Sequence, residues 1–188
     1  MKSELTCLAA LAAMLVSGCT TTSSGTPDGV VRTSSGLLSG VKEEGVLAFK
    51  GVPFAEPPIG DLRWRAPQTT SWEGVLEADS FGPACPQPLS DDGSPNGGGY
   101  AGPIDEDCLT INIWTPENAK DAPVMVWLFG GGGVVGAGSV ETYNGTKFAR
   151  DGVILATINY RLGGLGGFAH PEVTAAASPG EPYTNFHL

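Results

Sequence analysis

The sequence predicts an α/β protein whose mixed sheet begins with antiparallel strands. Short strand-like segments separated by turn residues fill positions 29–50. Two longer apolar runs follow at residues 124–129 and 153–159, and a segment that fits a short helix, residues 142–151, lies between them. Hairpins followed by strand, helix and strand are the order expected of a sheet that is antiparallel at one edge and parallel further in.

The first two thirds of the chain alternate between strands and an irregular segment. A charged turn is expected at residues 42–45, between two of the short strands. Four prolines argue against regular structure between residues 52 and 68, because proline lacks a backbone N–H. The strands expected before the central apolar run cover residues 29–34, 36–41, 46–50 and 109–114, and Pro116 ends the last of them.

The most informative stretch joins the apolar run 124–129 to four glycines, residues 130–133. A continuous apolar run is typical of a strand that is buried on both faces. Glycines directly after such a strand leave backbone N–H groups bare, and these either cradle a phosphate or hold the oxyanion of an acyl transfer. The run therefore predicts an anion-binding backbone, and the identity of the anion decides the function.

A dinucleotide site is one of these alternatives. Gly131, Gly133 and Gly136 match G-x-G-x-x-G after a strand. The fingerprint also needs a helix that begins at once and an acidic residue at the end of the next strand. Residues 136–138 are Gly-Ala-Gly, a poor start for a helix, and the next strand ends in Asn159. An oxyanion therefore fits these residues better than a dinucleotide does.

Composition sets the outer limits of function. The 188 residues are 41% hydrophobic, enough for one domain with its own core. The net charge is −10 and Lys and Arg form no cluster, which argues against a nucleic-acid partner. No cofactor is expected, and no metal site is expected because the chain's cysteines and histidines lack ligand spacing.

The amino terminus is expected to direct export. Residues 5–16 form an apolar stretch too short to span a bilayer, and small residues lead from it to Cys19. This junction resembles a bacterial lipobox, in which Cys19 is lipidated; the alternative is an ordinary secretory signal. The expected organisation is a signal peptide over residues 1–18, a flexible tether over 19–28 and the folded part over 29–188. Both alternatives place the protein outside the cytoplasm, as a periplasmic or outer-membrane lipoprotein or a secreted protein.

Two cysteines remain after export, Cys85 and Cys108. An exported protein meets an oxidising environment, where an even pair of cysteines favours a disulfide. The residues between them are rich in Pro, Gly, Ser and Asp, so the segment has little apolar surface with which to hold its shape. The alternative is two buried thiols.

Several motifs in order resemble the type-B carboxylesterases, the cholinesterase-like branch of the α/β-hydrolase fold. The resemblance runs from about Val30 to Phe186. Its motifs are Phe-Lys-Gly-Val-Pro-Phe-Ala-Glu-Pro-Pro-Ile-Gly at residues 49–60, Leu-Arg-Trp-Arg-Ala-Pro at 62–67, Phe-Gly-Pro-Ala-Cys-Pro-Gln at 81–87, Glu-Asp-Cys-Leu at 106–109, Asn-Ile-Trp-Thr-Pro at 112–116, the segment 123–133, and Asn-Tyr-Arg-Leu-Gly at 159–163.

The resemblance implies a serine esterase that forms an acyl-enzyme on a small-molecule carboxylic ester. By register, Gly131 and Gly132 would donate to the oxyanion, and Arg63 and Glu106 would form an ion pair that anchors the disulfide loop between the two cysteines. Gly133 stands where relatives usually have an aromatic residue. The disulfide loop carries Tyr100 and no Trp, so choline esters are not indicated.

The catalytic triad of such an enzyme is missing from this chain. No G-x-S-x-G motif occurs, and the two histidines, His170 and His187, do not lie in the family's catalytic register. The expectation is a carboxylesterase domain over 29–188 that ends before the nucleophile elbow and is inactive alone. Truncation is also expected to leave an unpaired sheet edge beside residues 153–159. The alternatives are a non-catalytic, adhesion-type relative of the same fold and a dinucleotide-binding domain.

Overall fold

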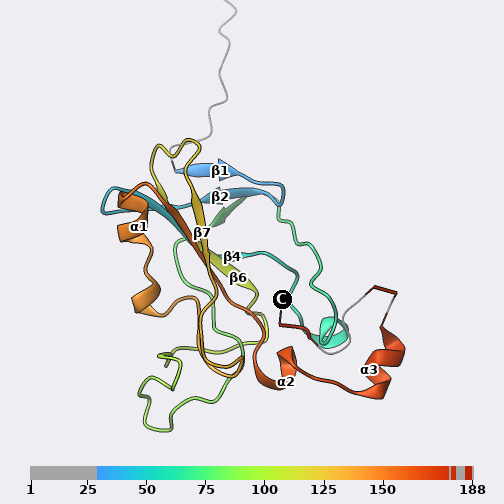
Figure 1. The fold of residues 1–188 in the computed structure, drawn as a ribbon. Helices are drawn as coiled ribbons and strands as arrows, with labels where there is room; N and C mark the ends of the chain where they lie inside the picture. The colour runs from blue at the N-terminus through green and yellow to red at the C-terminus, as the bar shows by residue number, and fades with distance from the viewer. Residues whose placement is uncertain (1–28, 178, 181–184, 188) are drawn as a thin grey trace, which may run out of the picture.

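A computed structural model describes residues 29–177, 179–180 and 185–187, and Figure 1 shows them as two sheets with short helices. The expected signal peptide, the expected tether and the lipidation site Cys19 lie outside the described residues. No helix of the described ranges is both long enough and apolar enough to cross a membrane.

The larger sheet has five strands in the order β3-β4-β6-β8-β7. Its first three neighbouring pairs are antiparallel, and β7 and β8 are parallel. This confirms a mixed sheet that is antiparallel at one edge. The strands are β3 (Val41–Glu43), β4 (Val46–Pro53), β6 (Thr110–Pro116), β7 (Val124–Trp127) and β8 (Ile154–Ile158).

A second sheet of three strands has the order β1-β2-β5 (Figure 1). β1 (Val30–Arg32) and β2 (Leu37–Ser39) form the expected antiparallel pair, and β5 (Val75–Glu77) adds to β2 in parallel. The strand expected over residues 36–41 is divided, because β2 belongs to this sheet and β3 begins the other at Val41. β5 was missed from the sequence, since three residues give too short a pattern to recognise.

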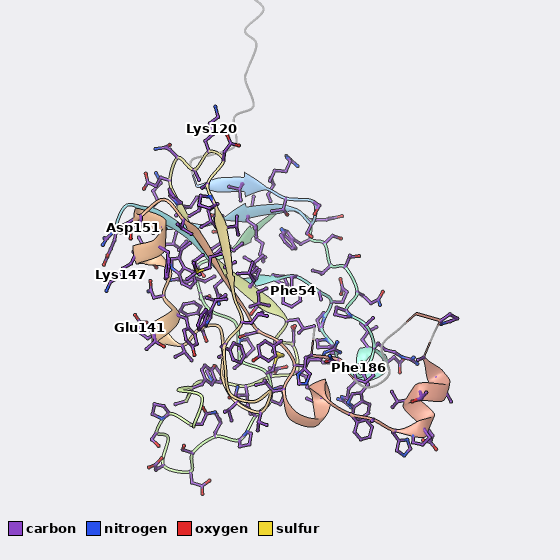
Figure 2. All side chains as sticks on the ribbon, in the orientation of Figure 1. Phe54, Lys120, Glu141, Lys147, Asp151 and Phe186 are labelled. Atoms are coloured by element: carbon purple, nitrogen blue, oxygen red, sulfur yellow. A yellow bond between two sulfur atoms is a disulfide. The ribbon has the colours of Figure 1, made fainter. Side chains whose placement is uncertain are left out.

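The core lies on both faces of β4, whose side chains alternate between the two. Val46 and Ala48 pack with Trp114 of β6 and with Ala149, while Leu47 on the opposite face packs in a cluster with the smaller sheet. Burial on both faces explains why residues 46–49 are all apolar. Figure 2 shows charged side chains such as Lys120, Lys147 and Asp151 at the periphery of the molecule.

The expectation that residues 124–129 are buried on both faces is wrong for β7. Val124 is 63% exposed, Val126 55% and Leu128 53%, and only the side of β7 that faces β8 is paired among the described residues. The expectation about the unpaired edge also needs correction: β8 is flanked by β6 and β7, so β7 forms the edge. A purely apolar strand with two exposed faces is unusual for a sheet edge.

The helices are short. The segment expected to be one helix over residues 142–151 is two: a 3-10 turn, η2 (Glu141–Tyr143), and α1 (Thr146–Arg150), separated by Asn144 and Gly145. The interruption lies at Asn144, whose backbone is not helical (φ −56°, ψ 121°) and whose Oδ1 accepts from the Thr146 N–H at 3.0 Å, a local hydrogen bond that competes with a continuous helix. The proline-rich segment also holds a 3-10 turn, η1 (Gly60–Leu62), and the two unanticipated helices are α2 (Gly163–Gly166) and α3 (Pro171–Ala176).

The strand directions bring four connecting segments to the same end of the larger sheet. β7 and β8 are parallel, so the glycines after β7 and Asn159 after β8 lie together at the carboxyl ends of these two strands. β6 is antiparallel to β8, so the residues that precede β6, including Cys108, lie at this end too. The last residues of β4 complete the group, because Pro53 pairs with Thr110 at the start of β6. Ligands of open α/β sheets bind outside the carboxyl ends of the strands.

Candidate active site

The glycine loop, defined here as residues 130–136, turns back on itself directly after β7. The carbonyl of Gly131 accepts hydrogen bonds from the N–H of Val134 (3.1 Å) and of Val135 (3.3 Å). Gly131 and Gly132 are exposed, and no described residue accepts from their own N–H groups. Two neighbouring glycines therefore have backbone donors without an acceptor among the described residues, on a loop that hydrogen bonds hold at Gly131, Gly133 and Gly136.

The position of Gly131 accommodates only glycine. Its φ is +126°, and a Cβ built on it would lie 1.9 Å from the carbonyl oxygen of Val135. That oxygen belongs to the backbone, so no side-chain rotation can relieve the contact. Gly132 has a φ of +65° and open space around it, so its glycine is required by backbone conformation alone. The loop is also not followed by a helix N-terminus, since α1 begins only at Thr146, which argues against the dinucleotide alternative.

The start of the glycine loop is held by Tyr160. Its hydroxyl donates to the Phe129 carbonyl at 2.5 Å, and the two rings stack with centroids 4.3 Å apart. Partial burial raises the pKa of the Tyr160 hydroxyl, and the neighbouring Tyr143 adds to this. The middle of the loop is held as well, because the N–H of Gly163 donates to the Gly133 carbonyl at 2.7 Å.

The end of the loop is held by Gln87, which the sequence interpretation had quoted only as part of a motif. Its side-chain Nε2 donates to the Gly136 carbonyl at 2.8 Å, and its Oε1 accepts from the Gly136 N–H at 2.7 Å. Gln87 follows Cys85 by two residues and belongs to the disulfide loop, defined here as residues 86–107. The disulfide loop and the glycine loop are therefore joined by side chain to backbone contacts.

A buried polar network fixes the chain just beyond the glycine loop. The Gly138 N–H donates to Asn159 Oδ1 at 2.8 Å, and the Gly138 carbonyl accepts from Thr157 Oγ1 at 2.8 Å. Asn112 on β6 donates to the same Thr157 hydroxyl at 3.1 Å. These three polar side chains are fully buried and hydrogen-bonded, which is the condition under which burial of polar groups is tolerated.

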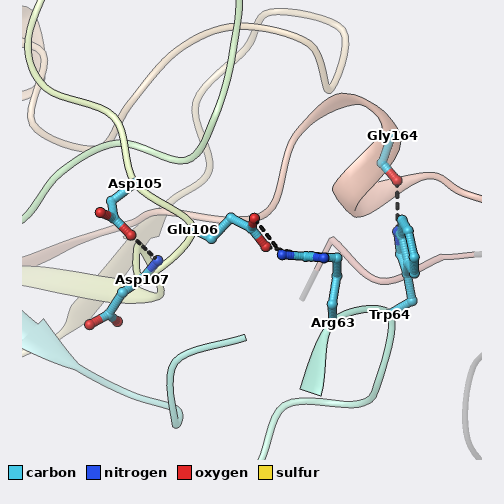
Figure 3. A network of polar contacts seen from close by, with 6 residues as sticks. All are labelled: Arg63, Trp64, Asp105, Glu106, Asp107 and Gly164. Atoms are coloured by element: carbon cyan, nitrogen blue, oxygen red, sulfur yellow. Dashed lines mark hydrogen bonds and ion pairs between the residues drawn. The ribbon is translucent and has the colours of Figure 1, made fainter. Parts of the chain in front are cut away.

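Cys85 and Cys108 form the disulfide, which confirms the pairing. Arg63 donates two hydrogen bonds of 2.7 Å, from Nε and from one terminal nitrogen, to the two carboxylate oxygens of Glu106. Figure 3 shows the two side chains facing each other. This bidentate ion pair ties the proline-rich segment to the end of the disulfide loop, and Glu106 raises the pKa of Arg63 further. Tyr100 is buried within the disulfide loop and donates to the Pro103 carbonyl, so it presents no open aromatic face.

Arg161 is the most buried cation among the described residues, with 3% exposure. One terminal nitrogen donates to the Arg65 carbonyl at 2.9 Å, while Nε and the other terminal nitrogen have no acceptor among the described residues. Burial lowers the pKa of this guanidinium. Sequence reasoning used Arg161 only to set the register of the resemblance and gave no sign of this burial.

The two histidines occupy different positions relative to the glycine loop. His170 is exposed and caps α3, where its Nδ1 accepts from the N–H of Glu172. His187 lies beside the loop: a Cβ on Gly133 would be 3.2 Å from its ring, and its Nδ1 donates to the Arg161 carbonyl at 2.5 Å. His187 thus packs against Gly133, the position at which the resemblance implies an aromatic residue.

An open apolar hollow of about 620 Å³ borders the glycine loop at Val134. Stacked Trp64 and Phe168 rings, with centroids 4.6 Å apart, form part of its wall, and the Trp64 indole N–H donates to the Gly164 carbonyl (Figure 3). The described residues that line the hollow are Trp64, Pro86, Gln87, Pro88, Val134, Leu162, Gly163, Gly164, Leu165 and Phe168.

The class of protein is α/β: its larger sheet is mixed, and a braced glycine loop follows a parallel strand beside a disulfide loop. Residues 27–176 match the carboxylesterase family, and the chain belongs to that family. It is 48% identical over 141 residues to phenmedipham hydrolase of Pseudarthrobacter oxydans, which covers 73% of this chain and 29% of that protein. It is 43% identical over 149 residues to para-nitrobenzyl esterase of Bacillus subtilis (strain 168), which covers 75% of this chain and 29% of that protein.

Solved structures agree with the sequence relatives. A para-nitrobenzyl esterase structure superposes with a TM-score of 0.73 at 38% identity, over 85% of this chain and 32% of that one. A carboxylesterase of Geobacillus stearothermophilus gives a TM-score of 0.64 at 40% identity, over 74% of this chain and 28% of that one. These structures confirm the α/β-hydrolase fold, and this chain spans about a third or less of their length.

Proposed function

We propose that this chain carries the oxyanion-binding part of a serine carboxylesterase, with Gly131 and Gly132 as backbone donors. The observation that carries the proposal is the pair of N–H groups on exposed glycines that have no acceptor among the described residues, on a loop held at its start, middle and end. Donors that are fixed before the reaction stabilise a developing oxyanion because they need no reorganisation when the charge appears.

The donors would act on the tetrahedral intermediate of ester hydrolysis. A serine oxygen attacks the ester carbonyl, the carbonyl oxygen becomes an anion, and the two amides hold it while the alcohol leaves. The apolar hollow borders the same glycine loop at Val134 and offers a place for an apolar group of a small ester. No group in the mechanism requires a cofactor.

We propose further that the chain alone does not hydrolyse esters. The nucleophile motif G-x-S-x-G is absent from the 188 residues, and His187 is engaged with the backbone of Arg161. The test is hydrolysis of p-nitrophenyl acetate by the purified chain, with and without a serine-directed phosphonate. The expected rate equals that of the buffer, and a turnover abolished by the phosphonate would overturn the proposal.

Export is a separate proposal that rests on the first 28 residues. An apolar segment followed by small residues and Cys19 supports a lipid-anchored protein outside the cytoplasm, with 1–18 as the removed signal, 19–28 as the tether and 29–188 as the esterase part. Mass spectrometry of protein extracted from bacterial membranes tests it. The expected N-terminal peptide begins at a diacylated Cys19, and an unmodified mature terminus elsewhere would overturn the anchor.

A further inference from the structure

Gly136 depends on one side chain for both of its backbone hydrogen bonds. Gln87 accepts from its N–H at 2.7 Å and donates to its carbonyl at 2.8 Å, and the Gln87 side chain is almost fully buried. An uncharged amide is suited to this task because it offers a donor and an acceptor side by side. A carboxylate could replace only the acceptor, and an apolar residue could replace neither.

The disulfide loop holds this amide in one orientation. Gln87 Nε2 also donates to the Cys85 carbonyl at 3.1 Å, and Oε1 also accepts from Asn96 Nδ2 at 2.8 Å. A flipped amide would place its NH2 group against the Gly136 N–H and the Asn96 NH2 group. Asn96 is fixed in turn, because its Oδ1 accepts from the N–H groups of Gly98 and Tyr100.

Gly136 is also where the glycine loop closes on itself. A Cβ on Gly136 would lie 2.5 Å from the Phe129 ring, so the two ends of the loop are in contact. Its neighbour Val135 donates to the Gly131 carbonyl, and the Val135 carbonyl lies against the Gly131 Cα. A shift of Gly136 is therefore transmitted through Val135 to Gly131 over only five residues.

We propose that Gln87 is the positioning residue of the candidate oxyanion hole, through which the disulfide loop sets the direction of the Gly131 and Gly132 amides. The inference rests on the proposed function, because it assigns a purpose to the geometry of those amides. Tyr160 fixes the start of the loop at Phe129, and Gln87 fixes its end.

Amide hydrogen exchange at Val134 and Val135 measures this directly, since both amides donate to Gly131 within the loop. The full chain with Gln87→Glu keeps the size of the side chain and makes the donor dependent on protonation. At about pH 8 the ionised carboxylate cannot donate to Gly136, and we expect the protection factors of both amides to fall at least about tenfold. At about pH 5.5 the buried carboxyl is protonated, and we expect protection to return to within about threefold of the wild type.

Gln68→Glu is the matched control, because the exposed Gln68 side chain donates to the nearby Ala66 carbonyl and has no hydrogen bond to the glycine loop among the described residues. It should leave both protection factors unchanged at either pH. Gln87→Met, neutral and similar in volume, should lower protection equally at both pH values, and it serves if Gln87→Glu loses its far-UV circular dichroism at high pH. Protection that is unchanged in both Gln87 variants, or that falls equally in Gln68→Glu, would overturn the proposal. The readout needs no catalysis, so such a result would leave the oxyanion assignment of Gly131 and Gly132 standing.

Discussion

Replacing Gly131 and Gly132 by alanine, one at a time, separates two requirements of the glycine loop: a positive φ and a lack of space for a Cβ. At Gly132 the φ of +65° is unfavourable for alanine but the Cβ meets nothing within 4 Å. The left-handed backbone alone should destabilise the fold by roughly 1–2 kcal/mol. At Gly131 the backbone term is joined by a contact of 1.9 Å with the Val135 carbonyl oxygen. Moving packed backbone to relieve such a contact typically adds roughly 1–3 kcal/mol.

We therefore expect Gly131→Ala to lower the free energy of unfolding by roughly 2–5 kcal/mol, clearly more than Gly132→Ala does. Urea unfolding followed by tryptophan fluorescence measures both values. Gly97→Ala is the control, because its φ lies outside the left-handed region, its Cβ meets nothing and its effect should stay within about 0.5 kcal/mol. A Gly132→Ala variant that is as unstable as Gly131→Ala would refute the reasoning from the Val135 contact.

Three further outcomes follow from the described contacts. Replacing Cys85 and Cys108 together by alanine should lower the free energy of unfolding by about 3 kcal/mol, because the bridge closes a loop with a separation of 23 residues; an unchanged melting temperature would contradict this. Partial burial, then the carboxylates of Asp105 and Glu56, raise the pKa of Asp107, so the folded state holds that proton more tightly and stability falls as pH rises through the raised pKa. Asp105→Asn should move the pKa of Asp107, measured by carboxyl NMR titration, back toward its ordinary value, and no movement would remove Asp105 as a cause. The exposed apolar edge strand β7 should make the wild-type chain self-associate, and Val126→Lys, which places a charge on this strand, should reduce that association in sedimentation velocity. A wild-type chain that stays monomeric at high concentration would contradict this expectation.

The sequence allowed the strands with strong patterns to be predicted, and the order of the elements indicated a mixed sheet that is antiparallel at one edge. Residues 46–50 and 153–159 became β4 and β8 because burial on both faces leaves a continuous apolar run. The same pattern gave a wrong prediction of burial at β7. An apolar run indicates a strand suited to burial, but it does not show which part of the chain covers that strand. The single helix predicted over residues 142–151 is interrupted at Asn144, whose side chain accepts from the Thr146 N–H in place of a helical backbone bond.

The sequence indicated the candidate oxyanion donors, but it did not indicate the residues that hold the glycine loop in place. Glycines after an apolar strand are visible in a sequence, the disulfide followed from an even cysteine pair in a chain expected to be exported, and the Arg63–Glu106 pair followed from the motif register. Gln87 and Tyr160 act across separations of 49 and 31 residues, and no local pattern marks such partners. The burial of Arg161 is likewise a product of packing between distant segments.

The most direct test of the central claim moves the glycine loop into a complete enzyme. Residues 124–138 of this chain would replace the matching segment of the Bacillus subtilis para-nitrobenzyl esterase, a relative with 43% identity. We expect the folded chimera to hydrolyse p-nitrophenyl acetate. Gly132→Ala in it keeps the amide N–H but disfavours the φ of +65° that orients it, so we expect kcat to fall at least about a hundredfold, as when one oxyanion donor is lost. A folded chimera whose kcat is unaffected by Gly132→Ala would contradict the assignment of this loop as an oxyanion hole.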